Sequence, residues 1–171
     1  MKIITQEKEK GFSMVEMIIY IAIFAIFVGA LITFSLNINS SRLRSQMMLE
    51  VKDQGADLMR TLTTSIKNAT VINNPGTGVS SGVLSINTSN LQTTPTIFSE
   101  DGEALYITEG TSSPIALTNN KVKLTNLTFT NVSQSSTPGI IKIRFTISNT
   151  ASKSSPAEQY SVDFYGSSAV R

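Results

Sequence analysis

The sequence predicts an α+β chain, in which one long N-terminal helix is followed by an antiparallel β-sheet domain. Residues 12–34 are apolar except for Ser13, Glu16 and Thr33. Between residues 37 and 70, apolar side chains recur at steps of three, four or seven, as on one face of a helix. Beyond this region, short runs of β-branched and aromatic residues alternate with turn residues, which indicates strands.

The composition excludes several chemistries. The 171 residues include no Cys and no His, so a disulfide framework, a thiol nucleophile and a Ser-His-Asp relay are ruled out. We therefore expect no enzyme and no cofactor. The formal net charge is +2, but the chain after Thr70 carries six basic and six acidic residues. Because the domain is balanced, nucleic acid is not expected as a partner.

The apolar run at residues 12–34 is long enough to cross a lipid bilayer. As a helix it would reach about 30–35 Å, which matches the hydrocarbon core. The run is too long for the apolar part of a secretory signal peptide, and no Ala-x-Ala cleavage site follows it. Three lysines precede it and Arg42 and Arg44 follow it, which slightly favours a cytoplasmic N-terminus.

The residues before and within this run form a specific motif. The stretch KGFSMVEM at residues 10–17, followed by IIYIAIFAIFVGAL, resembles the class III signal of type IV prepilins and type II secretion pseudopilins. The resemblance implies that prepilin peptidase cuts after Gly11 on the cytoplasmic side and N-methylates Phe12. It also implies that Glu16 is the acid that registers one subunit against the next during assembly.

The same resemblance implies a set of partners and a location. The partners would be prepilin peptidase, other pilins or pseudopilins in a filament, an inner-membrane assembly platform and the lipid bilayer. The precursor would cross the inner membrane once before joining a cell-surface or periplasmic filament. Many type IV pilins carry a proline inside the apolar helix, whereas this chain has Thr33 at about that place. The difference favours a minor pilin or a J-type minor pseudopilin.

These observations divide the chain into four expected parts. Residues 1–11 would be a cleaved leader, and residues 12–36 a transmembrane and assembly helix. Residues 37–70 would form an amphipathic stem that buries the stripe from Leu43 to Ile66 against a sheet. Residues 71–171 would form the β-rich domain, completing a pilin-like α+β fold.

Within the β-rich domain we expect strands at 82–87, 96–100, 103–109, 114–118, 121–130, 140–148 and 159–165. A hairpin turn at Asp101-Gly102 would place Phe98 opposite Leu105. A second turn at Asn119-Asn120 would pair the strands on either side of it, with Leu117 opposite Val122 and Ile115 opposite Leu124.

The apolar pattern of the later strands predicts which side chains face the core. Val122, Leu124, Leu127 and Phe129 share a face only if a bulge intervenes near Thr125-Asn126. The next strand would point its apolar residues inward and Lys142 and Arg144 outward. In the last strand Asp163 would point outward, near one of these two cations.

Two further groups of charged residues offer alternative functions. Lys121, Lys123, Lys142 and Arg144 could form an exposed strip that binds DNA or a surface, as in a competence or adhesion pilin. Glu100, Asp101 and Glu103 surround a tight turn, where Ca²⁺ would relieve their repulsion. A solvated turn is the alternative, because the spacing differs from that of an EF-hand loop.

Overall fold

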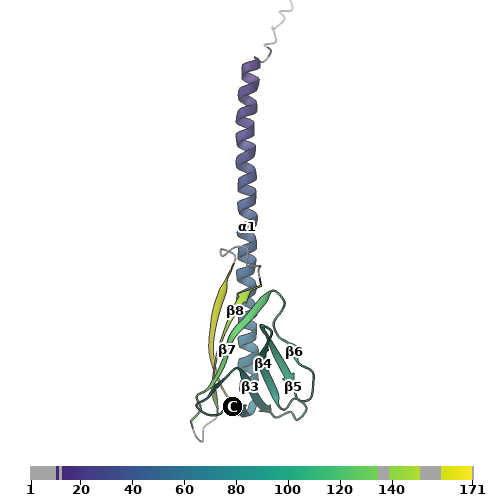
Figure 1. Cartoon of the computed structure of the whole chain (residues 1–171), viewed down its shortest axis with the longest axis vertical. Helices are drawn as coiled ribbons and strands as arrows, with labels where there is room; N and C mark the ends of the chain where they lie inside the picture. Colours follow the sequence, from purple (N-terminus) through teal and green to yellow (C-terminus); the bar gives the residue numbers. More distant parts are fainter. Residues whose placement is uncertain (1–10, 12, 135–138, 151–158, 171) are drawn as a thin grey trace, which may run out of the picture. The chain divides into compact units, whose positions relative to one another are not determined.

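The computed structural model describes residues 11, 13–134, 139–150 and 159–170 (Figure 1). In these ranges a helix, α1 (Met14–Lys67), precedes the strands. The strands are β1 (Ala69–Asn74), β2 (Ser80–Ser81), β3 (Val83–Thr88), β4 (Thr96–Asp101), β5 (Ala104–Glu109), β6 (Ile115–Ala116), β7 (Val122–Asn131), β8 (Ile140–Asn149) and β9 (Ser161–Ala169). The predicted α+β class is confirmed.

Helix α1 is 54 residues long and carries Glu16 in its first turn and Lys67 in its last. Both charges complement the helix dipole. The helix ends at Lys67, a little before the expected end at residue 70, and Ala69 already belongs to β1. The β-branched residues of the segment ATVINN favour a strand, and β1 gains a ladder with β3. The sequence pattern missed both β1 and the short strand β2.

The chain divides into two compact units at the boundary between Leu43 and Arg44, and α1 contributes to both. The prediction that the buried stripe begins at Leu43 was wrong, since this side chain is 56% exposed. Burial begins at Val51, which is fully buried, within the second unit.

The strands of the second unit form two antiparallel sheets. One has the order β1-β3-β4-β5-β6 and the other the order β2-β7-β8-β9. Figure 1 shows β7 and β8 side by side, and β3, β4, β5 and β6 lie together in the other sheet. The core between the elements contains the buried residues Leu84, Ile86, Phe98, Leu105, Leu124, Phe129, Ile141, Ile143, Phe145 and Ile147.

The first predicted hairpin forms, but its register is shifted by two residues. Phe98 lies opposite Ile107 rather than Leu105, and Asp101 pairs with Ala104. The turn residues are therefore Gly102 and Glu103, with φ of 56° and 68°. A two-residue turn with both φ values positive matches the twist of the strands. The shift is an even number, so Phe98 and Leu105 keep the buried faces that the sequence predicted.

The second predicted hairpin, at Asn119-Asn120, was wrong. Residues 115–116 pair with β5, whereas β7 pairs with β2 and β8 in the other sheet. This turn is therefore the connection between the two sheets. Asn119 holds it through its side chain, which donates to Glu50 Oε1 at 2.5 Å and accepts from the Lys121 amide at 3.0 Å.

The predictions for the second sheet are confirmed at the bulge and on the inner faces. The β7–β8 register shifts between Thr125 and Thr128, where Asn126 has a φ of 58°. As a result, the apolar residues on both sides of the bulge are buried. In β8, Lys142 and Arg144 point outward. Asp163 also points outward, but it accepts hydrogen bonds from Thr146 at 2.7 Å and Tyr165 at 3.3 Å.

The second part of α1 packs along β9. Three contacts join residues spaced by four on the helix to residues spaced by two on the strand: Gly55 to Phe164, Met59 to Gly166 and Thr63 to Ser168. Four helical residues rise about 6 Å, and two strand residues about 6.7 Å, so the two elements stay in step. Gly55 is required here because a Cβ atom at this position would overlap the Phe164 ring.

We predict that Gly55→Ala destabilises the sheet domain. Replacing glycine in a helix by alanine normally gains about 1 kcal/mol. Here the added methyl group displaces Phe164, which also stacks on Phe145 with the ring centroids 5.3 Å apart. Overpacking costs about 1–3 kcal/mol, so we expect a net loss in the free energy of unfolding. Guanidinium titration of the full chain in detergent, followed by tyrosine fluorescence, measures it.

The control is Gly29→Ala, in the same helix, where an added Cβ atom would meet nothing within 4 Å. This variant should leave the unfolding midpoint of the sheet domain unchanged. Equal midpoints for both variants would show that Gly55 does not contact Phe164 closely.

Candidate functional site

The residues of the predicted processing site precede and begin α1. Gly11 is exposed, and Phe12 lies outside the described residues. The Ser13 carbonyl accepts a hydrogen bond from the Met17 amide at 3.1 Å, which starts the helical ladder. Gly11 therefore precedes the helix, where a side-chain-free residue lets another backbone approach closely. The assignment of Gly11 and Phe12 as the cleavage pair stays a prediction.

Glu16 has a partner within its own helix. The Tyr20 hydroxyl donates to Glu16 Oε1 at 3.3 Å, one helical turn further on. The sequence interpretation missed Tyr20, although its spacing of four residues from Glu16 places both side chains on one helix face. In a hydrocarbon environment this hydroxyl is a donor that would partly satisfy the carboxylate.

The part of α1 that contains Glu16 exposes its apolar side chains. An 18-residue window has a mean hydropathy of 2.7, and none of it is buried. The helix is thus long and apolar enough to cross a membrane. A second local bond is made by Thr33 Oγ1, which donates to the Gly29 carbonyl at 3.0 Å. Such a bond satisfies the hydroxyl without a partner outside the helix.

The predicted basic strip is divided by ion pairs. Lys121 Nζ lies 3.8 Å from a carboxylate oxygen of Glu50, and Lys123 Nζ lies 2.5 Å from one of Glu103. These two lysines are therefore partly neutralised. Within the ranges that the structure covers, neither Lys142 nor Arg144 has a carboxylate in ion-pair distance. Two of the four cations are thus paired with acids, and a joint role of the four in binding stays a prediction.

Two acidic side chains of the predicted calcium site likewise have partners within the chain. Glu103 pairs with Lys123, and its carbonyl accepts from the Leu124 amide at 2.7 Å. Glu100 Oε2 accepts from the Leu127 amide at 3.4 Å, beside the bulge of β7. Among the described residues, no group of three Asp, Glu, His or Cys could hold a metal ion. The calcium alternative gains no support from this arrangement.

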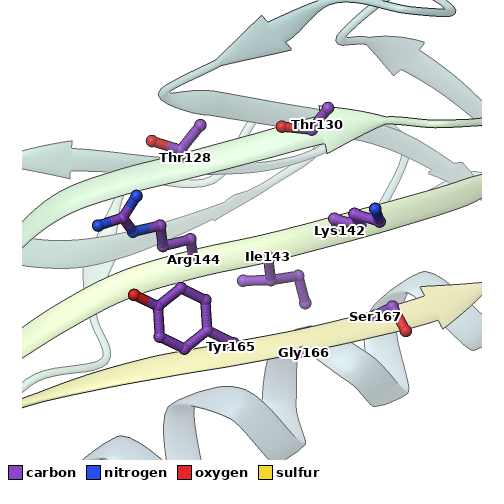
Figure 2. Close-up of a pocket in the computed structure, with 8 residues that line it drawn as sticks. All are labelled: Thr128, Thr130, Lys142, Ile143, Arg144, Tyr165, Gly166 and Ser167. Carbon is purple, nitrogen blue, oxygen red and sulfur yellow. The ribbon is translucent and has the colours of Figure 1, made fainter.

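The outer face of the second sheet carries a hollow of about 540 Å³. The residues that line it come from three neighbouring strands (Figure 2): Thr128 and Thr130 on β7, Lys142, Ile143 and Arg144 on β8, and Tyr165, Gly166 and Ser167 on β9. The guanidinium carbon of Arg144 lies 5.4 Å from the centroid of the Tyr165 ring. Residues distant in the sequence thus form one surface, on which charged and hydroxyl groups stand among apolar atoms.

Comparison with known proteins identifies the N-terminal segment. A family model described as the prokaryotic N-terminal methylation motif matches residues 7–32. No curated protein and no solved structure gives a significant match. The matched segment contains Gly11, Phe12 and Glu16. The resemblance to type IV pilins and pseudopilins is therefore confirmed: the chain carries their processing motif, followed by the long apolar helix and antiparallel sheets of a pilin-like fold.

Proposed function

We propose that this protein is a structural subunit, of the minor kind, in a type IV pilus or a type II secretion-like pseudopilus. The observation that carries the proposal is the methylation motif at residues 7–32, which continues into an apolar helix whose side chains are exposed among the described residues. An apolar surface of this size must be covered by lipid or by other subunits. A filament subunit uses both in turn.

The proposed path begins in the inner membrane. Residues 12–36 span the bilayer, residues 1–11 are removed on the cytoplasmic side by prepilin peptidase, and the new N-terminal amine on Phe12 is methylated. Residues 37–70 then form the stem and residues 71–171 the domain outside the membrane. An assembly platform would move the processed subunit from lipid into the filament, where the apolar helices pack together.

Glu16 would register the subunits during this transfer. A carboxylate at the centre of a membrane helix costs about 2.5–3.5 kcal/mol on insertion scales, and less near the helix end. The methylated amine of a neighbouring subunit offsets that cost only in one axial position, which disfavours slipped arrangements. Before assembly, the Tyr20 hydroxyl supplies a weaker partner within the chain.

A minor position is supported by the composition of the apolar helix. It contains no proline, and Thr33 is bonded to its own helix backbone. The DNA-binding alternative is less well supported, because two of its four cations are paired with Glu50 and Glu103. The surface-binding alternative has a specific observation in its favour, the hollow shown in Figure 2.

We predict that co-expression with a prepilin peptidase yields a chain that begins at N-methylated Phe12. The mass of the N-terminal peptide measures this outcome. Gly11→Leu should reduce the processed fraction at least tenfold, because the side chain blocks the approach of the protease backbone. Gly29→Leu, a matched change inside the helix, should be processed normally. A wild-type chain that still begins at Met1, alongside a control substrate that is cleaved, would contradict the proposed function.

We further predict that Glu16→Ala is processed normally but enters filaments at least tenfold less well than the wild type. The physical reason is the loss of the charge pair that selects the register. Tyr20→Phe, which removes a single oxygen, should reduce the steady-state amount of membrane-inserted precursor without preventing assembly. Immunoblots of sheared filaments and of membranes separate the two effects.

The matched control is Asp53→Ala, which removes an exposed acid from the same helix outside the apolar run. Filament incorporation of this variant should equal that of the wild type. If Glu16→Ala also assembles normally, the registration role is wrong, whereas the processing result would still stand.

A further inference from the structure

We propose that the outer face of the second sheet binds an acidic oligosaccharide, with Arg144 as the carboxylate-binding residue. The proposal concerns the sheet domain and does not rest on the filament role. It begins from the ladder registers, which place six polar side chains in two rows across three strands. One row is Thr130, Lys142 and Ser167, and the other is Thr128, Arg144 and Tyr165.

Each cation is therefore flanked by a hydroxyl group on both sides. Lys142 and Arg144 are two residues apart on β8, so they lie about 7 Å apart along the strand and point to the same face. Figure 2 shows their side chains rising beside the hydroxyl groups of the neighbouring strands. Together they line the hollow of about 540 Å³, which is open to solvent on the outer face of the sheet.

Arg144 is held in place, and no described carboxylate lies within ion-pair distance of it. Its guanidinium lies over the Tyr165 ring, and the Tyr165 hydroxyl donates to Asp163 Oδ2 at 3.3 Å. Asp163 is held in turn by Thr146 at 2.7 Å. The acid thus fixes the tyrosine, and the tyrosine fixes the arginine through its ring. A cation positioned in this way loses little freedom on binding a ligand.

The remaining chemistry favours a carboxylated sugar. A planar guanidinium binds a carboxylate through two parallel hydrogen bonds, whereas Lys142 supplies a point charge for a second acidic group. The threonine and serine hydroxyl groups can both donate to and accept from sugar hydroxyl groups. Tyr165 is 65% exposed and offers an apolar ring edge beside these polar groups.

A nucleic acid fits this surface less well. The sequence after Thr70 has equal numbers of acids and bases, so the domain has no general positive field to retain a long polyanion. The two other cations of the predicted strip are paired with Glu50 and Glu103. Among the residues that the structure describes, Lys142 and Arg144 have no ion-pair partner, and a local site of this kind suits a short ligand with one or two charges.

The test is calorimetric titration of the full chain in detergent with trigalacturonate, a trimer of an acidic sugar. We expect saturable binding, no binding of the neutral galactose trimer, and weaker binding of a twelve-residue thymidine strand. Arg144→Gln should weaken trigalacturonate binding at least tenfold, and Tyr165→Phe about threefold through the lost anchor to Asp163.

The matched control is Lys123→Gln, which removes one positive charge from the same face of the same sheet. It should change the affinity less than twofold, because Glu103 already pairs with this lysine. If Lys123→Gln and Arg144→Gln weakened trigalacturonate binding equally, the total charge of the surface would explain the binding, and the proposal would be overturned. Absent binding of trigalacturonate, or tighter binding of the thymidine strand, would overturn it as well. None of these results depends on cleavage after Gly11, so the filament role is tested separately.

Discussion

The structure depends on how one helix meets two different environments. Before Leu43, α1 has large apolar side chains on all sides, and they are exposed in the single chain. From Val51 onward it has one apolar stripe, and the chain buries that stripe itself. The free energy gained by removing apolar surface from water is roughly proportional to the area removed. Because the first part of the helix exposes so much apolar area, it is stable only in lipid or against other subunits. The first part of the helix therefore requires an apolar environment that its own described residues do not supply.

The second part of the helix is fixed by close packing as well as by burial. Glycine at residues 55 and 166 lets α1 and β9 approach until a ring and a thioether fill the gaps. The common rise of four helical and two strand residues repeats this contact along both elements. The sheet that contains β9 is thus supported from its inner face. Its outer face is left to carry polar groups, which is where Arg144 and Tyr165 lie.

Charges in the sheet domain follow a simple division. Lys121, the residue before β7, pairs with Glu50 of the helix. Lys123 of β7 pairs with Glu103, which lies in the turn between β4 and β5 of the first sheet. Exposed ion pairs contribute little to stability, commonly under about 1 kcal/mol, but they remove cations from the accessible field. Arg144 is instead held by an aromatic ring, so its charge remains available. The sequence has four basic residues in the predicted strip, and the ion pairs leave two of them, Lys142 and Arg144, available on the described surface.

The sequence alone determined the class of fold, the processing motif, the inner faces of β7 and β8, and the bulge between Thr125 and Thr128. These features depend on local spacing, and spacing is preserved when the chain folds. Tertiary structure decided the rest. Asn119 and Asn120 have the composition of a hairpin turn, yet they connect two sheets, because β6 pairs with β5 and β7 pairs with β8. Likewise, no spacing rule could place Tyr165 beside Arg144, since their contact follows from the β8–β9 register, in which these two residues lie opposite each other.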